Sequence, residues 1–252
     1  MRAFFTSTNT MEKIIFNMAT MPPRIPALLD SIPSILPQCD VLNVYLNNFD
    51  SVPEILKHPK INVVMSQEHD GDLGDVGKFF FCNTWTKGYI FTVDDKIIYP
   101  PDHVKKHIEL IERSNRKAVV SCHGRNLKPN CSSYYNDGHE FFGCLGTILN
   151  DKFVHELGTG VMAFHHSTIK VNLDMFPTTN MTDVWFSIEL QKRNIPILVR
   201  KHMKGDYGIS RRHDDSYSIH ATFNKGRNDD YQTKVVNDFT WKNNSCPLAA
   251  KK

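Results

Sequence analysis

The sequence GYIFTVDDKIIYPPDHV, residues 88–104, decides the fold class of this chain. Its apolar run from Tyr89 to Val93 predicts a buried strand that ends where the polar residues begin. The pair Pro100-Pro101 has the fixed φ that suits a helix entry, so a helix is expected from there to Arg113. A strand followed closely by a helix is the repeating unit of an α/β sheet.

Similar units lie on both sides of this stretch. Strands are expected at 13–20, 41–46, 61–65, 117–122, 160–165 and 195–199. Helical segments are expected at 25–36, 52–57, 77–85 and 183–193. The polar residues 125–142 predict a long loop. This alternation indicates an α/β protein with a mostly parallel central sheet flanked by helices.

The composition fits one globular domain over residues 1–252. Hydrophobic residues make up 40% and charged residues 23% of the chain, and no linker or internal repeat divides it. The net charge of +3 is too small to indicate nucleic-acid binding, although it suits a site that receives a diphosphate.

Membrane and secretion signals are not expected in this sequence. No window reaches the roughly 18–20 consecutive apolar residues of a membrane span, and residues 1–10 lack the apolar core of a signal peptide. The six cysteines are scattered without the close spacing of a zinc site, which favours reduced thiols. We therefore expect a cytoplasmic protein, either free or peripheral to a membrane that carries a lipid-linked acceptor.

Two adjacent acids, Asp94 and Asp95, close the strand within the opening stretch. Open α/β sheets bind ligands at the carboxyl ends of their strands, and carboxylates there can hold a divalent cation against a diphosphate. The alternative is that both acids only cap the following helix. Spacing favours neither.

Two other segments can carry chemistry. In GDLGDVGK, residues 71–78, glycines and Lys78 could approach a phosphate at a helix N-terminus, although an ordinary solvated turn has the same composition. Asp183 could be a general base or the cap of the helix that follows it.

In their order along the chain, these segments resemble the inverting GT-A-fold glycosyltransferases of the large family-2-like group, small bacterial and viral enzymes of glycan and polysaccharide assembly. The resemblance covers roughly residues 13–200 and is carried by NMATMPPR (17–24), YLNNF (45–49), GDLGDVGKFF (71–80), GYIFTVDDKIIYPPDHV (88–104), HG (123–124), LGTGVMAFH (157–165) and NMTDVWFSIELQKRNIPI (180–197). It implies a Rossmann-like single domain, with a nucleotide-binding half at 13–123 and an acceptor-binding half and C-terminal tail at 124–252.

The resemblance also implies roles for particular residues. Asp183 would be the catalytic base that deprotonates the acceptor hydroxyl, and Gly158, Thr159 and Gly160 would border the donor sugar and the acceptor. The nucleotide-sugar donor would be bound by Ala19, Thr20, Arg24, Asp72, Lys78, Asp94, Asp95 and Lys96.

A Mn²⁺ or Mg²⁺ ion is expected on the diphosphate, because the family motif holds a metal there. The expected pattern has three acids, but its third position here is Lys96. The implied metal ligands are therefore Asp94 and Asp95 with His213 or His220. Alternatively, Lys96 neutralises the leaving diphosphate itself, or the protein is weakly active or inactive.

The resulting hypothesis is a glycosyltransferase, a hexosyl- or related sugar transferase, that moves a sugar from a nucleotide-sugar, with UDP as the expected nucleotide. The acceptor would be a hydroxyl of a glycan, glycolipid or glycoprotein. One alternative is a nucleotidyltransferase. Such an enzyme would normally have a glycine-rich loop after its first strand, and the segment here, MATMPPR at 18–24, contains no glycine. Another is a catalytically silent carbohydrate-binding or scaffold protein.

Overall fold

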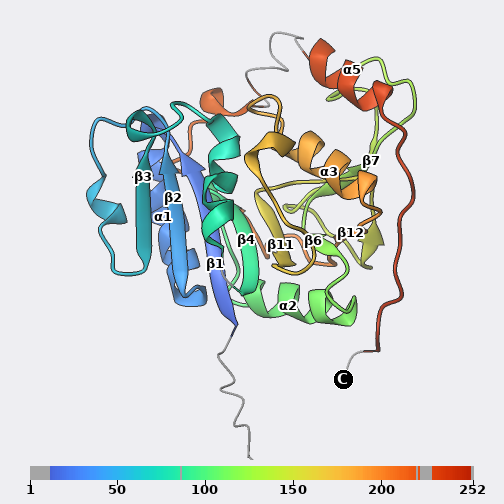
Figure 1. The fold of residues 1–252 in the computed structure, drawn as a ribbon, viewed down its shortest axis with the longest axis horizontal. Coiled ribbons are helices and arrows are strands. Elements are labelled where there is room, and N and C mark those ends of the chain that lie inside the picture. Colours follow the sequence, from blue (N-terminus) through green and yellow to red (C-terminus); the bar gives the residue numbers. More distant parts are fainter. Residues whose placement is uncertain (1–11, 86, 220, 222–228, 251–252) are drawn as a thin grey trace, which may run out of the picture.

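A computed structural model of the chain describes residues 12–85, 87–219, 221 and 229–250. Its centre is an eight-stranded sheet in the order β3-β2-β1-β4-β11-β6-β12-β9 (Figure 1). The strands are β1 Lys13–Thr20, β2 Val41–Leu46, β3 Ile61–Met65, β4 Gly88–Asp94, β6 Val119–Ser121, β9 Lys152–Phe153, β11 Val161–His165 and β12 Ile197–Val199.

The sheet is mostly parallel, which confirms the predicted Rossmann-like α/β class. Strands β3, β2, β1 and β4 run parallel to one another, whereas β11 is antiparallel to both of its neighbours. In the register of β1 with β4, Ala19 pairs with Asp94. The carboxyl ends of these two strands therefore lie side by side at one edge of the sheet.

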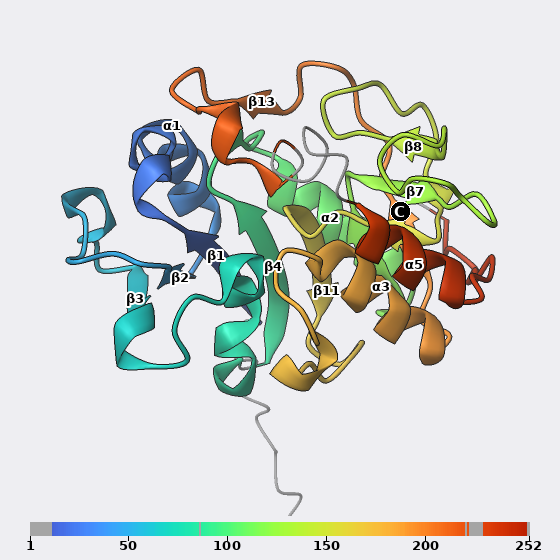
Figure 2. The same cartoon turned by 90° about the horizontal axis from the view of Figure 1, so that it is seen from above.

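Helices cover both faces of this sheet. Helices α1 (Ile25–Ile35) and α2 (His103–Arg113) pack against one face, and helix α3 (Thr182–Lys192) and the 3₁₀ helix Gly74–Thr84 pack against the other (Figure 2). The order of strands and helices follows the apolar spacing of the sequence, including the entry of α1 after Pro22-Pro23.

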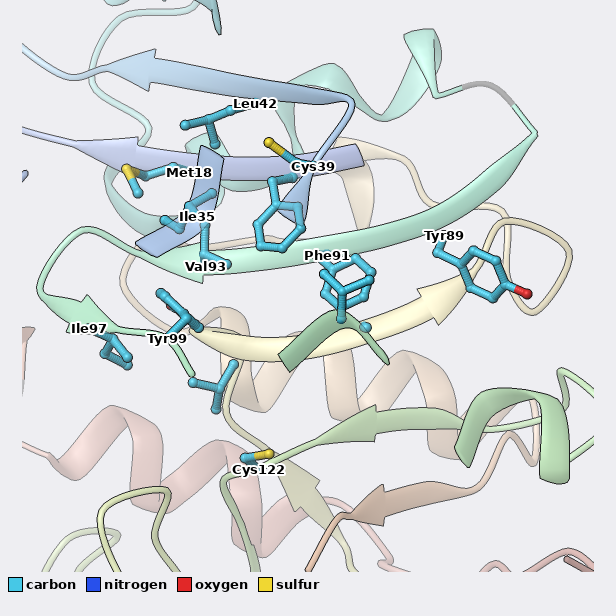
Figure 3. Close-up of a cluster of buried hydrophobic side chains, with 14 of the residues drawn as sticks. Met18, Ile35, Cys39, Leu42, Tyr89, Phe91, Val93, Ile97, Tyr99 and Cys122 are labelled. Carbon is cyan, nitrogen blue, oxygen red and sulfur yellow. The ribbon is translucent and has the colours of Figure 1, made fainter. Parts of the chain in front are cut away.

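Two apolar cores form because successive side chains of a strand point to opposite faces. On β4, Phe91 packs towards α1 and α2, whereas Ile90 packs towards α3. Phe91 stacks on Phe16 with a ring-centroid distance of 4.8 Å. Figure 3 shows the first core, in which Met18, Phe91 and Val93 lie among the buried side chains.

The predicted loop at 125–142 is wrong at both ends, since it begins and finishes in strands. Strands β7 (Gly124–Asn126), β8 (Glu140–Phe142) and β10 (Glu156–Leu157) form a separate three-stranded antiparallel sheet. Each of these strands has only two or three residues, which is too short for a period of alternating side chains to be recognised in the sequence.

Other short elements carried no sequence signal that we recognised. Strand β5 (Ile97–Ile98) pairs with β13 (Gly208–Ile209), and helix α5 (Asp230–Asp238) lies beyond them along the chain. All six cysteines are free thiols. Within the described residues, no helix is long and apolar enough to cross a membrane.

Candidate active site

A pocket of about 1140 Å³ opens at the carboxyl ends of β1 and β4. Eleven of the residues assigned from the sequence line it, and they come from segments far apart in the chain. They are Ala19, Thr20, Arg24, Asp72, Lys78, Asp94, Asp95, Lys96, Thr159, Gly160 and Asp183.

Asp94 ends β4 and forms an ion pair with Lys78, which the 3₁₀ helix Gly74–Thr84 presents. The Lys78 side chain is 7% exposed. Burial would raise the pKa of Asp94, but the charges of Lys78 and Lys96 outweigh it and lower that pKa to about 2. Asp94 is therefore a carboxylate that is ion-paired with Lys78 and further stabilised by the nearby charge of Lys96.

The position of Asp94 is set by its backbone. Its amide donates to the Tyr99 hydroxyl at 2.7 Å, and this hydroxyl donates to the carbonyl of Gly160 at 2.6 Å. A Cβ on Gly160 would lie 2.5 Å from the Asp94 carboxylate. Gly160 is needed because any side chain there would occupy the space that Asp94 uses.

Asp95 is held on the opposite side by β1 and the segment after it. Thr20 Oγ1 donates to Asp95 Oδ2 at 2.8 Å, and Arg24 Nη1 lies 3.5 Å from Asp95 Oδ1. Burial raises the pKa of Asp95, and the charge of Arg24 offsets part of this effect. Asp95 is 8% exposed, so its oxygens serve mainly to fix Thr20 and Arg24.

Arg24 also joins the C-terminal segment to the pocket. Its Nη2 donates to the carbonyl of Tyr217 at 2.8 Å, and its Nη1 lies 3.0 Å from His213 Nδ1. Tyr217 itself lines the pocket. One cation thus anchors both Asp95 and the segment that closes one side of the pocket.

The described residues do not fit a divalent cation. Asp94 is paired with Lys78, Asp95 with Arg24, and Lys96 adds a third positive charge where a third acid is expected. The described part of the chain brings together no group of three or more His, Cys, Asp or Glu side chains suited to a metal. The ion would meet cations rather than the free oxygen ligands it prefers.

Neither histidine assigned to the metal changes this result. His213 is bound to Arg24 and lies 3.5 Å from Asp215, so it faces a cation rather than the two aspartates. His220 lies outside the described residues.

Asp183 stands in the first turn of α3 and is fixed by Thr159. Its Oδ1 accepts hydrogen bonds from the Thr159 amide at 2.7 Å and from Thr159 Oγ1 at 2.6 Å. Its Oδ2 makes no hydrogen bond to any described residue, so one oxygen is available to a ligand in the pocket. The N-cap residue of α3 is Met181, so Asp183 is not the cap of its own helix.

Asp75, which the sequence analysis missed, holds the start of α3. Its Oδ1 accepts from the Asn180 amide at 2.6 Å, and its Oδ2 accepts from the amide and the hydroxyl of Thr182 at 3.0 and 2.6 Å. Burial raises the pKa of Asp75, and the charge of Lys78 counters that rise. Asp75 and Lys78 share one 3₁₀ helix, which therefore links the paired Asp94 to the helix that carries Asp183.

Two assigned residues have roles other than those expected. Gly158 does not line the pocket, because it packs under the His123 ring, where a Cβ would lie 2.8 Å from that ring. Asp72 lines the pocket, but both of its oxygens accept hydrogen bonds from the protein, one from Asn48 Nδ2 at 2.6 Å and the other from the Gly74 amide at 2.8 Å.

The far half of the pocket lies beyond Asp183 and is lined by His123, Arg125, Tyr134, His139 and Phe141. The resemblance places the acceptor-binding half at 124–252 and includes His123 in its HG segment, but no residue of this group was assigned a role from the sequence. The aromatic content of 134–142 was a further signal, but only the pairing of β7 with β8 brings these side chains to the pocket.

Comparisons with known proteins bear on the fold of the chain. No family model matches the sequence. No curated protein sequence matches it either. Among solved structures, the chain is similar to 4-diphosphocytidyl-2C-methyl-D-erythritol synthase from Anaerococcus prevotii, with a TM-score of 0.49 and 12% identity over 85% of this chain and 96% of that one. A likeness at this level bears on neither substrate nor reaction.

Proposed function

We propose that this protein is a glycosyltransferase that moves a sugar from a nucleoside-diphosphate donor to a hydroxyl acceptor with inversion. The observation that carries the proposal is the division of charge in one pocket. Lys78, Lys96 and Arg24 gather at the end of β4, and Asp183 presents a carboxylate oxygen from the start of α3.

The cations at the end of β4 suit the leaving group of such a reaction. Cleavage of a glycosyl–phosphate bond leaves a nucleoside diphosphate, whose added negative charge needs positive groups already in place. Lys96 is the cation best suited to this, since Lys78 and Arg24 are each paired with an aspartate. This assignment requires no metal ion, in keeping with the poor fit of the donor set.

Asp183 suits the other half of the reaction. An acceptor hydroxyl must lose its proton as it attacks the anomeric carbon, so a carboxylate within hydrogen-bonding reach assists the step. Thr159 holds one oxygen of Asp183 with two hydrogen bonds and thereby aims the other. In-line attack opposite the leaving diphosphate inverts the anomeric centre.

The nucleoside would lie near the end of β1, where Ala19, Asn47 and Asp72 line the pocket. A UDP-sugar is the first donor to test, on the basis of the family resemblance. In this proposal residues 13–123 supply most of the donor site, and residues 124–252 supply the base and the acceptor site.

Nucleotidyl transfer is the competing reaction for a pocket with this charge. In that reaction a phosphate oxygen attacks a nucleoside triphosphate, and because this oxygen is already anionic it needs no base. The fixed carboxylate of Asp183 would then have no chemical role, which favours glycosyl transfer. A silent binding protein would likewise not need it.

A binding screen followed by two product-release assays separates the three functions. The protein is first screened for thermal stabilisation by UDP-, GDP-, dTDP- and CMP-sugars, with Mn²⁺ and with EDTA, because a bound donor stabilises the folded state. It is then tested for release of nucleoside diphosphate from the stabilising donor, and for release of pyrophosphate from nucleoside triphosphates with sugar phosphates. Release of the diphosphate supports the proposal, and release of pyrophosphate replaces it with nucleotidyl transfer. Binding without turnover indicates a silent protein.

A further inference from the structure

We propose that the half of the pocket beyond Asp183 is the acceptor subsite and that it takes a neutral sugar ring stacked on Phe141. This inference rests on the proposed glycosyl transfer and names the acceptor class for the same site. It follows from the contrast between the two halves of the pocket. The donor half is lined by lysine, arginine and aspartate side chains, whereas the other half is lined mainly by aromatic and imidazole side chains.

Phe141 is an exposed aromatic ring held in a fixed position. It belongs to β8, yet 57% of it is exposed, and it lines the pocket. Its ring meets His123 edge-on at a centroid distance of 4.9 Å, and a Cβ on Gly143 would come within 2.7 Å of it. The Arg125 guanidinium lies over the ring with its Cζ 5.7 Å from the centroid, and more than half of Phe141 remains exposed. A ring that is fixed in this way in a pocket offers an apolar platform to a ligand.

A sugar ring matches this platform chemically. One face of a pyranose carries mainly C–H groups, which are slightly positive, and the face of an aromatic ring is slightly negative. The hydroxyls at the rim of the sugar remain free for polar contacts. His123 can make one of these, because its ring nitrogens form no hydrogen bond with any described residue.

In its described part, the subsite has one permanent cation, which is paired with an acid whose pKa burial raises to about 7. The cation is Arg125 and the acid is the buried Glu156, with Arg125 Nε 3.2 Å from Glu156 Oε1, and the Tyr134 hydroxyl donates to the same oxygen at 2.6 Å. Burial lowers the pKa of His123 to about 4 and also lowers that of His139, so both are uncharged at neutral pH. With Asp183 near by, an anionic acceptor would be repelled rather than held.

The platform adjoins the proposed base through direct contacts. The Phe141 ring touches His123, the His123 ring packs on Gly158, and Thr159 binds Asp183. A sugar stacked on Phe141 therefore lies beside Asp183, where a hydroxyl of its rim can be deprotonated.

The test is ligand-observed saturation-transfer NMR on the full chain with UDP present. The probes are methyl β-D-glucopyranoside, methyl β-D-galactopyranoside and methyl β-D-glucuronide. The two neutral glycosides should bind through the protons of their C–H face, and the glucuronide should bind more weakly. Phe141→Ala should weaken binding about 3- to 10-fold, the loss expected for one aromatic stacking contact. Phe141→Trp should retain binding.

Leu149→Ala is the matched control, because Leu149 is 71% exposed and does not line this pocket. Unchanged glycoside binding in Phe141→Ala, no binding to the unmodified protein, or a preference for the glucuronide would each overturn the proposal. Thermal stabilisation by UDP-sugars is measured on the same proteins. If no donor stabilises any of them, the proposed function itself fails. If donors bind but glycoside binding does not depend on Phe141, only the acceptor subsite fails.

Discussion

In the proposed reaction, the side chains of Asp183 and Lys96 have two different roles. Asp183 offers one carboxylate oxygen, while its other oxygen is held by Thr159. Lys96 lines the same pocket, and its positive charge helps to lower the pKa of Asp94. A base and a cation are the two groups that glycosyl transfer needs, so each can be tested by a single substitution.

Asp183→Asn should stop transfer without loss of donor binding. The amide oxygen can still accept from Thr159, but an amide cannot take the acceptor proton, so turnover should fall by about 10²- to 10⁴-fold. Steady-state release of nucleoside diphosphate measures the rate, and thermal stabilisation by the donor measures binding. Transfer at the original rate would remove Asp183 from the role of base.

Lys96→Ala should lower turnover by about 10²- to 10³-fold, the usual effect of removing one group that stabilises developing charge. EDTA should leave the rate of the unmodified protein unchanged, because Lys96 and not a metal ion would meet the leaving diphosphate. Lys204→Ala, which changes an exposed lysine that does not line the pocket, is the control. Loss of activity in EDTA with recovery in Mn²⁺ would contradict the metal-free assignment.

At the level of elements, the 3₁₀ helix Gly74–Thr84 connects two parts of the site. Lys78 pairs with Asp94 on β4, and Asp75, within the same helix, holds the first turn of α3. The separation of Asp75 and Thr182 in sequence is 107 residues, so only the folded chain makes this link.

Asp75→Ala should loosen the start of α3 and so misplace Asp183. Loss of a helix-end carboxylate with several hydrogen bonds should cost about 1–2 kcal/mol of unfolding free energy. Turnover should fall while donor affinity is retained. Thr182→Val tests the same link from the side of α3, since it removes one of the three hydrogen bonds of Asp75 and also the 2.9 Å contact between Thr182 Oγ1 and Thr159 Oγ1. Equal turnover in Asp75→Ala and the unmodified protein would show that the contact does not position the base.

At the scale of the whole molecule, a buried polar cluster lies under the sheet away from the pocket. His103 Nδ1 lies 2.8 Å from the Tyr207 hydroxyl, and Cys122 Sγ lies 3.0 Å from the same oxygen. His107 packs on His103 with a ring-centroid distance of 4.2 Å. These contacts tie α2 to β6 and to the segment that precedes β13.

The cluster should make folding sensitive to acid. Burial, followed by the charge of Arg200, lowers the pKa of His107 to about 3, and burial likewise lowers that of His103. The unfolded chain binds a proton at His107 below about pH 6.5, whereas the folded chain does not. The contribution of His107 to stability is therefore complete above about pH 6.5 and is lost as the pH falls towards its folded value.

Comparison with His107→Leu isolates this effect. The stability of the unmodified protein relative to the variant should fall by on the order of 1.4 kcal/mol for each pH unit below about 6.5. Urea unfolding between about pH 7.5 and 5 measures the difference, and other titrating groups such as Glu156 cancel because both proteins contain them. A difference that does not change with pH would mean that His107 does not remain neutral in the folded state.

The sequence alone was sufficient for the main elements, because apolar spacing reports which side chains a strand or helix buries. It predicted β1, β2 and β3 with their observed bounds, and it identified the residues at the end of β4. It also assigned eleven residues that line the pocket. It misjudged Gly158 and the loop at 125–142, and it left α5 unassigned.

Only the tertiary structure could decide the partners of these side chains. The bonds of Asp75 to α3, the pairing of Lys78 with Asp94, and the placement of Phe141 beside His123 all join segments that are distant along the chain. Apolar periodicity is a local property that follows from burial on one face of an element. Hydrogen bonds and ion pairs in the pocket depend on which strand ends meet, and this is set by the order and register of the whole sheet.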